Sequence, residues 1–368
     1  MTKMKFSHFL LALLLPVILL CTSCNDKINL MADFKDIAIS YAVLNMNDSV
    51  HYFKIYRGYQ TEDNAYVEAS NWEQIYYPVD SIEVRLEEYS TNGEFLNSAV
   101  LDTTTRVERN AGHFANPKQL LYYSTWKLDE ACKYRLVVKN VNNGKEIYAE
   151  TNIVGNCVFS KPYSQNPFNC SNDHAPQFQI VSGEGSLRDK NVAVADMYLI
   201  FHYIEVDNQT DAVVHKTISK KMNASYLTPQ SDGSISFNGF SAKDLLLAIK
   251  ENVKPNDKVT RYVDAINGNP FFCLEVQAWL ATKEFQIYHN VTAPNTSLVQ
   301  DRLEYTNFVS PDNNAYGLLA SRNSCQSIYK FDNTGGNYNE DSLVKGSITK
   351  GLNFNYYRNS PEFPRDRK

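Results

Sequence analysis

The most distinctive chemistry in the sequence belongs to a thiol near its start. Cys24 follows two small residues and an uncharged run over residues 9–21, which is apolar apart from its single Pro16. Lys3 and Lys5 precede that run. A membrane-spanning helix needs about 20 apolar residues, so this shorter run is typical of an export signal. The pattern therefore predicts an export signal.

Residues 20–24 (LCTSC) resemble the lipobox of bacterial lipoproteins. In that family the cysteine thiol is diacylglycerylated, the signal is cut just before it, and the freed amine is commonly acylated, for example with palmitate. The resemblance implies a signal peptide at 1–23, lipidation of Cys24 and a tether at 24–34. Two or three acyl chains anchor a protein firmly, whereas one binds marginally. Cys21 stands where the family usually has Leu, and a soluble export signal is the alternative.

Five further cysteines follow the anchor, and an odd number leaves at least one without a partner inside the chain. Cys157 and Cys170 lie in a segment rich in Pro and Asn, and export supplies oxidising conditions. We predict a Cys157–Cys170 disulfide, with Cys132 and Cys325 as alternative partners for either thiol. Cys273 lies in an apolar run and is expected to be a buried thiol.

Other catalytic and metal-binding patterns are weak. The seven histidines show no His-x-x-x-His spacing, and no Cys-x-x-Cys occurs after Cys24, so no zinc site and no cofactor are predicted. Asp196, Glu205 and Glu275 fall on strand patterns, where a glycosidase pair is one interpretation and solvent-facing strand positions are the simpler one. The sequence therefore does not favour an enzyme.

Four three-residue segments resemble the O-glycosylation acceptor of Bacteroidota. Each has an acidic residue, then Ser or Thr, then an apolar residue or Thr. Their hydroxyl residues are Ser49, Ser81, Thr103 and Ser342. The alternative is that Asp-Ser and Asp-Thr turns simply lead into strands. Both interpretations remain open at this point.

Charge limits the choice of partners. The chain has 36 basic and 41 acidic residues, a net charge of −5, and removal of Lys3 and Lys5 with the signal gives −7. A mildly acidic chain without clusters of Lys and Arg binds nucleic acid poorly, so no nucleic-acid partner is expected.

The first half of the mature chain has the pattern of a β-sandwich. Residues 81–89 alternate polar and apolar, and Asn92-Gly93 turns them into residues 94–101. A second hairpin is predicted at residues 133–154. Leu128, six residues before Tyr134, resembles the tyrosine corner of fibronectin type III domains. The alternative is an ordinary Tyr in a hairpin strand.

The expected fold is mainly β: an immunoglobulin- or fibronectin III-like sandwich followed by a second β-rich domain with one or two short helices. One helix is predicted to begin at Ser241, with Asp244 completing a capping box. The predicted boundaries are a sandwich at 35–154, a linker at 155–176, a second domain at 177–345 and a polar tail at 346–368.

The overall layout is similar to a family of uncharacterised Bacteroidota outer-membrane lipoproteins, a domain of unknown function often encoded beside TonB-dependent receptors. The shared features are the hairpin at 80–101, the Tyr134-x-Leu136 strand, and the segments 305–307 (YTN) and 316–322 (YGLLASR). The family's glycine-rich stretch before the final strand is thin here.

This resemblance implies a cell-envelope protein, anchored in the outer membrane on its periplasmic or its surface side, with a non-enzymatic binding or receptor-accessory role. A TonB-dependent receptor is the implied partner. The alternatives are a tethered hydrolase of glycan or peptide, and a structural stalk or scaffold subunit.

Overall fold

The computed structural model describes residues 34–78, 80–163, 176–183, 187, 191–222, 227–292, 305–333 and 339–364. Over these residues the fold is mainly β, with several sheets and few helices, as predicted. None of the helices in the described ranges combines the length and the apolar character needed to cross a membrane.

The strands are β1 (Ala38–Leu44), β2 (His51–Arg57), β3 (Ile82–Ser90), β4 (Phe95–Val100), β5 (Asp102–Thr104), β6 (Leu121–Ser124), β7 (Cys132–Asn140), β8 (Glu146–Asn152), β9 (Cys157–Lys161), β10 (Gln177–Ser182), β11 (Val192–Asp207), β12 (Val213–Met222), β13 (Ile235–Asn238), β14 (Val259–Val263), β15 (Phe272–Thr282) and β16 (Ala315–Lys330). The helices are α2 (Ala65–Glu68), α3 (Trp72–Ile75), α4 (Ala242–Asn252), α5 (Lys283–Thr292) and α6 (Asn339–Val344), with 3₁₀ turns η2 (Ile266–Gly268) and η4 (Tyr357–Asn359).

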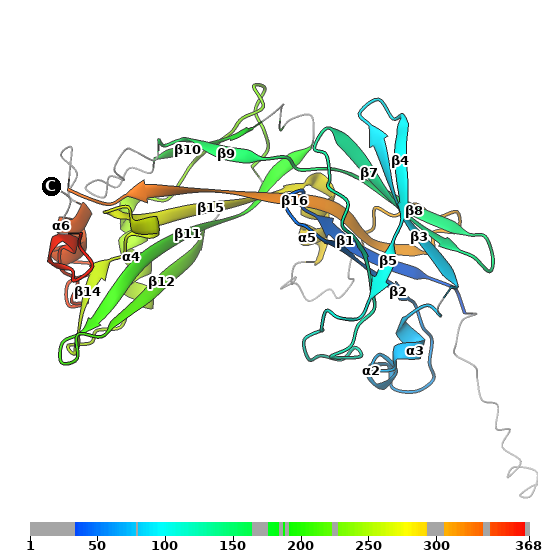
Figure 1. The fold of residues 1–368 in the computed structure, drawn as a ribbon, viewed down its shortest axis with the longest axis horizontal. Helices are drawn as coiled ribbons and strands as arrows, with labels where there is room; N and C mark the ends of the chain where they lie inside the picture. Colours follow the sequence, from blue (N-terminus) through cyan, green and yellow to red (C-terminus); the bar gives the residue numbers. More distant parts are fainter. Residues whose placement is uncertain are drawn as a thin grey trace, which may run out of the picture.

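One long sheet runs through the whole molecule, in the order β12-β11-β15-β16-β1-β2-β6-β5, and β14 also pairs with β11 (Figure 1). The strand β16 joins the two halves. Its first part, from Ala315 to Ser321, pairs in parallel with β1, and its second part pairs with β15. The close approach of β16 to β1 requires Gly317, because a Cβ there would lie 1.8 Å from the Ser40 carbonyl oxygen.

The first half is a sandwich, in which the sheet β4-β3-β7-β8 packs against the β1–β2 part of the long sheet. The predicted alternation is present: Val84 and Leu86 are buried and lie opposite Val138 and Leu136 in the register. Phe53 of β2 belongs to the same core. Burying each such side chain contributes about 1.5–3 kcal/mol.

The tyrosine-corner residues are both buried, with Leu128 2% and Tyr134 0% exposed. The Tyr134 hydroxyl accepts a hydrogen bond from the Asp129 backbone N–H at 2.9 Å and donates one to Glu88 Oε1 at 2.5 Å. The bond to backbone just upstream is the one that a tyrosine corner makes.

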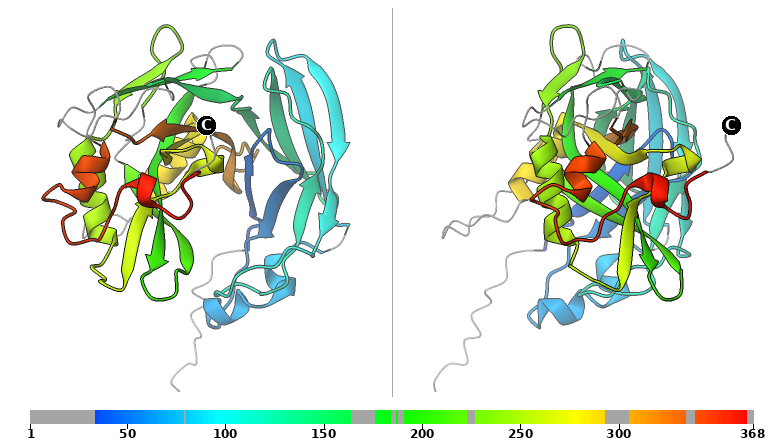
Figure 2. Two further views of the ribbon diagram at one scale, coloured as in Figure 1. Left: turned by 60° about the vertical axis from the view of Figure 1, so that its left-hand side comes forward. Right: turned by 90° about the vertical axis from the view of Figure 1, so that its left-hand side faces the viewer.

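The second half has a separate core, in which the sheet β13-β10-β9 lies over the β11–β15–β16 strands (Figure 2). Phe178 of β10 stands edge-to-face with Tyr329 of β16 at 6.0 Å between ring centroids. The helix α4 is capped as predicted, since the Ser241 hydroxyl accepts from the Asp244 N–H and Asp244 Oδ2 accepts from the Ser241 N–H.

Two predicted boundaries are wrong. The predicted linker begins with strand β9, and the chain before it is held in place: Asn323 donates to the Gly155 carbonyl at 3.0 Å, and the Val154 N–H donates to Ser321 Oγ at 3.0 Å. The expected break at 155 is absent because these polar groups find partners on β16. In addition, part of the predicted second domain, from Ala315 to Ser321, completes the first sandwich.

The predicted polar tail at 346–368 is also wrong over its described part, which ends at residue 364. Leu352, Phe354 and Tyr357 are buried in the second core. Phe354 forms a bridge with Arg261 on β14. Three apolar side chains spaced among polar ones are enough to fold this segment onto the end of the molecule farthest from α2 and α3 (Figure 1).

Candidate functional site

The carboxylates considered for hydrolysis each contact a basic side chain. Asp196 pairs with Lys221, and Glu275 lies 3.3 Å from His202. Glu205 forms ion pairs with Lys216 at 2.6 Å and with Arg261 at 2.8 Å.

Burial alone would raise the pKa of Glu205, but the hydrogen bonds from Lys216 and Arg261 outweigh it and lower the pKa. A general acid needs the opposite shift. The geometry around Glu205 therefore suits a structural ion pair.

The predicted modification sites differ in accessibility. Cys24, the predicted lipidation residue, lies outside the described residues. Ser49 and Thr103 are exposed, and Ser342 is half-buried on α6. Ser81 is 7% exposed and its hydroxyl donates to the Pro78 carbonyl at 2.7 Å, so a transferase would not reach it in the folded protein.

The cysteines have an arrangement that spacing did not suggest. Cys157 begins β9 and Cys325 lies in β16, and both are buried in the second core. The side chain of Cys157 interacts with that of Cys325, and this contact together with burial raises the pKa of the Cys325 thiol. Cys170, the predicted partner of Cys157, lies outside the described residues. Cys132 is half-buried and Cys273 fully buried.

One histidine lies between two carboxylates. His215 Nδ1 is 2.8 Å from Asp264 Oδ2, and Nε2 is 3.3 Å from Glu362 Oε1. The hydrogen bond with Asp264 raises the pKa of His215. Three distant segments supply these residues, so no sequence spacing could have revealed the cluster. Both ring nitrogens already face a carboxylate, which suits a protonated imidazole.

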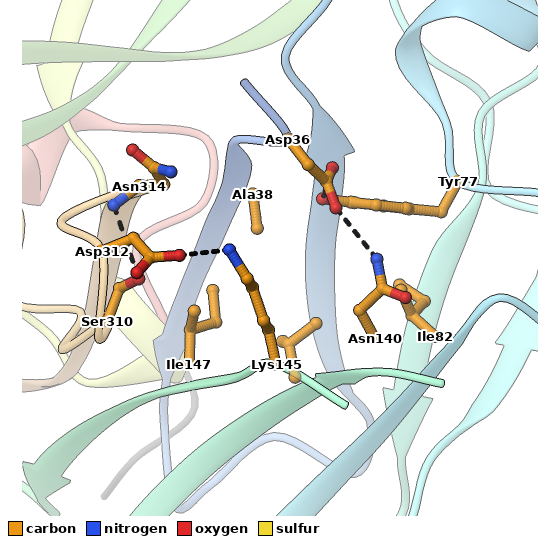
Figure 3. A pocket seen from close by; sticks show the side chains of 11 residues that line it. Asp36, Ala38, Tyr77, Ile82, Asn140, Lys145, Ile147, Ser310, Asp312 and Asn314 are labelled. Atoms are coloured by element: carbon orange, nitrogen blue, oxygen red, sulfur yellow. Dashed lines mark hydrogen bonds and ion pairs between the residues drawn. The ribbon is translucent and has the colours of Figure 1, made fainter. Parts of the chain in front are cut away.

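A small cavity opens between the two sheets of the first sandwich, beside the start of β1 (Figure 3). Asp36 accepts hydrogen bonds from the Tyr77 hydroxyl at 3.1 Å and from the Asn140 amide at 2.9 Å. Lys145 points to Asp312 across the same opening and forms an ion pair with it. The polar groups named here satisfy one another, and the volume of about 40 Å³ is far below that of a ligand site.

A larger groove lies beside β2, on the loop between β5 and β6. We call it the Arg109 groove. Its volume is about 350 Å³, within the roughly 300–1,000 Å³ of small-molecule sites. It is lined by Lys54, Glu108, Arg109, Asn110, Ala111, Gly112, Phe114 and Gln119.

The loop that forms the groove is fixed by its own hydrogen bonds. The Arg109 N–H donates to the Pro117 carbonyl at 2.7 Å, closing the loop. The Asn116 amide donates across it to the Gly112 carbonyl at 3.2 Å, and the Ala115 N–H donates to the Ala69 carbonyl, just after α2, at 3.0 Å. A loop held this way presents its side chains without a large ordering cost on binding.

Aromatic rings position the central cation of the groove. The Arg109 guanidinium lies 4.9 Å from the Phe114 ring centroid and 5.3 Å from that of Tyr56. Its Nη2 donates to the Tyr56 hydroxyl at 2.5 Å. The ring cluster continues behind Tyr56. The ring centroids of Tyr56 and Tyr76 are 5.5 Å apart, and those of Tyr76 and Trp72 are 4.3 Å apart. The guanidinium is therefore oriented by stacking and by a neutral phenol.

Charges and polar atoms in the groove are incompletely matched. Lys54 and Arg109 form no ion pair with any carboxylate in the described parts of the chain. Burial, and then the positive charge of Arg109, lower the pKa of Lys54. Arg109 Nη1 and Gln119 Oε1 are buried without a hydrogen-bond partner among the described residues, and Gln119 is only 4% exposed.

Sequence reasoning did not find the Arg109 groove. Its residues come from one strand and one irregular loop, which carries no hydrophobic period. The sequence did contain one local signal. Arg109, Phe114 and Gln119 lie among Asn, Gly and Pro residues, so this loop carries cationic, aromatic and amide side chains of the kind that binding loops use. No protein-family model matches the chain, and no curated protein matches it either.

Proposed function

We propose that this chain is a lipid-anchored protein of the cell envelope, held by Cys24 in the outer membrane, with a non-enzymatic binding role exercised through the Arg109 groove. The observation that carries the binding role is the unmatched polar chemistry of that groove. A buried donor at Arg109 Nη1 and a buried acceptor at Gln119 Oε1 each cost stability when left without a partner. Each such group in a native structure calls for an explanation, and the explanation proposed for these two is a bound ligand.

Binding is favoured over hydrolysis by the state of the carboxylates. Glu205, Asp196 and Glu275 are each engaged by a basic side chain, and Glu205 has a lowered pKa. The groove itself holds a single carboxylate, from Glu108. A glycosidase would need a second carboxylate facing the first across the same cleft, and the described lining of the Arg109 groove does not supply one.

The proposed partner is a TonB-dependent receptor of the same membrane. The protein would deliver or hold a ligand close to the receptor, and its two halves, joined through β16, would present the groove at a fixed position relative to the rest of the chain. This partner is taken from the family resemblance of the layout.

A capture experiment tests the proposal. The full-length processed protein in detergent is immobilised and exposed to solubilised outer membranes, and the bound receptor and bound small molecules are quantified. Three forms are compared: wild type, Phe114→Ala, and Lys118→Gln. Lys118 is the matched control, because its ammonium lies 5.0 Å from the Trp72 ring and does not line the groove.

We expect wild type and Lys118→Gln to retain a small molecule, with a TonB-type receptor, while Phe114→Ala loses the small molecule. Equal small-molecule capture by all three forms would remove the groove from the function. Release of shortened saccharides during incubation would instead establish the hydrolase alternative.

A further inference from the structure

The Arg109 groove selects for a negative charge. Lys54 and Arg109 face each other without an acidic partner among the described residues, and their repulsion contributes to the lowered pKa of Lys54. Glu108 also lines the groove, is exposed, and makes no ion pair with either cation within those residues. An anion placed between the two cations would relieve the repulsion. The planar guanidinium, whose Nη1 is buried without a partner among the described residues, suits a carboxylate.

The groove also needs a ligand that donates hydrogen bonds. Gln119 uses its Nε2 to donate to the Glu108 carbonyl at 3.2 Å, which fixes the amide and leaves Oε1 as an acceptor. The Glu108 side chain is a second acceptor on the same wall. An acceptor pair is satisfied by the hydroxyl groups of a ligand, which simple carboxylates lack.

The Phe114 ring offers a ligand a third kind of contact in the Arg109 groove. Phe114 is 46% exposed, although one part of its surface packs on Arg109 and Tyr56. The negative face of an aromatic ring attracts the slightly positive C–H groups on one side of a sugar ring. A volume of about 350 Å³ accommodates one or two such rings.

We propose that the Arg109 groove binds an acidic sugar, with a uronic-acid carboxylate between Arg109 and Lys54, hydroxyl groups on Gln119 and Glu108, and the sugar ring on Phe114. This inference rests on the proposed binding function and names its ligand class. No covalent step is involved.

Calorimetric titration of the full-length processed protein in detergent tests the ligand class. The probes are digalacturonate and galactobiose, which share the same two rings and differ in the carboxylates. We expect wild type to bind digalacturonate at least about tenfold more tightly than galactobiose, because a charge-assisted hydrogen bond is worth about that factor. Affinity for digalacturonate should fall as salt rises.

Variants assign the effect to the groove. Lys54→Gln should weaken digalacturonate binding at least about tenfold and change galactobiose binding little, whereas the Lys118→Gln control should change neither by more than about twofold. Because Arg109 is stacked between rings and its loss would disturb the loop, Lys54→Gln is the primary variant, with circular dichroism as the folding check.

Three results overturn the ligand class. Equal affinity for both disaccharides would show that charge is not selected, and unchanged digalacturonate binding in Lys54→Gln would place the site elsewhere. Absence of binding to either probe would exclude sugars of this kind. The capture experiment above is independent of these probes, so retained material lost in Phe114→Ala would keep the binding function while the acidic-sugar assignment fails.

Discussion

Replacing Tyr134 by Phe removes one hydroxyl and leaves the aromatic packing in place, including the edge-to-face contact with Trp126 at 6.1 Å. That hydroxyl satisfies the Asp129 N–H at 2.9 Å and donates to Glu88 at 2.5 Å. Glu88 is half-buried, so water can replace part of its lost bond. Asp129 is itself exposed, but its N–H is bonded to a side chain that is 0% exposed, and a donor left unsatisfied against that side chain costs about 1–3 kcal/mol.

We therefore expect Tyr134→Phe to lower the free energy of unfolding by about 1–3 kcal/mol in urea titrations of the full-length processed protein. Tyr89→Phe is the matched control on the neighbouring strand, because the Tyr89 hydroxyl also donates to a carboxylate, Glu87, at 2.7 Å but its side chain is half-exposed. Its loss should cost no more than about 0.5 kcal/mol. If both variants stay within about 0.5 kcal/mol of wild type, the corner does not hold the sandwich together.

Three further measurements address other parts of the fold. Gly317→Ala should cost about 2–5 kcal/mol, because the new Cβ meets a β1 carbonyl at a φ of +126°; Gly93→Ala, at a φ of +85° in open space, should cost about 1–2 kcal/mol, and equal losses would refute the close approach. Non-reducing peptide mapping after oxidation should link Cys157 to Cys325, whereas a peptide joining either thiol to another cysteine would contradict the contact. The pKa of His215 is raised in the folded state, so its stabilising contribution is complete below pH about 6.5 and disappears as pH rises through the folded pKa. Since the ring is 60% exposed, the gap between wild type and His215→Gln should be at most about 1 kcal/mol at pH 6 and should close by pH 9; a gap that widens with pH would reverse the sign.

The parts of the fold that were predictable are those in which local pattern and tertiary structure agree. Val84 and Leu86 alternate with polar residues because one face of β3 is buried, and Asn92-Gly93 makes the tight turn to β4. The cap at Ser241 is decided by residues within one helical turn. In each case the physical cause lies within about ten residues of the sequence.

The strand β16 was not predictable in the same way. Ser321 and Asn323 are 0% and 1% exposed, which polar side chains rarely tolerate without partners. Their partners are Val154 and Gly155, more than 160 positions away along the chain. A strand that is buried through such distant hydrogen bonds has no alternating pattern of its own, so the sequence around it looks irregular.

The candidate site depends on the same kind of long-range placement. Lys54 and Arg109 come together because β2 pairs with β6 and the preceding loop folds back over β2. The proposed lipid anchor is the reverse case, because the resemblance that suggests it lies in a few adjacent residues. Sequence alone therefore predicted the class of fold, and the anchor stays a prediction, whereas the groove required the structure.

Tethering to the envelope is the premise on which the proposed function depends, and Cys24 tests it directly. The measurement is incorporation of labelled palmitate together with membrane fractionation, comparing wild type with Cys24→Ala in the full-length chain. A thiol is required for acylation, so Cys24→Ala should incorporate no label, accumulate as unprocessed precursor and lose stable attachment to the outer membrane. A Cys24→Ala protein that remains labelled and bound to the outer membrane like wild type would contradict the lipid anchor.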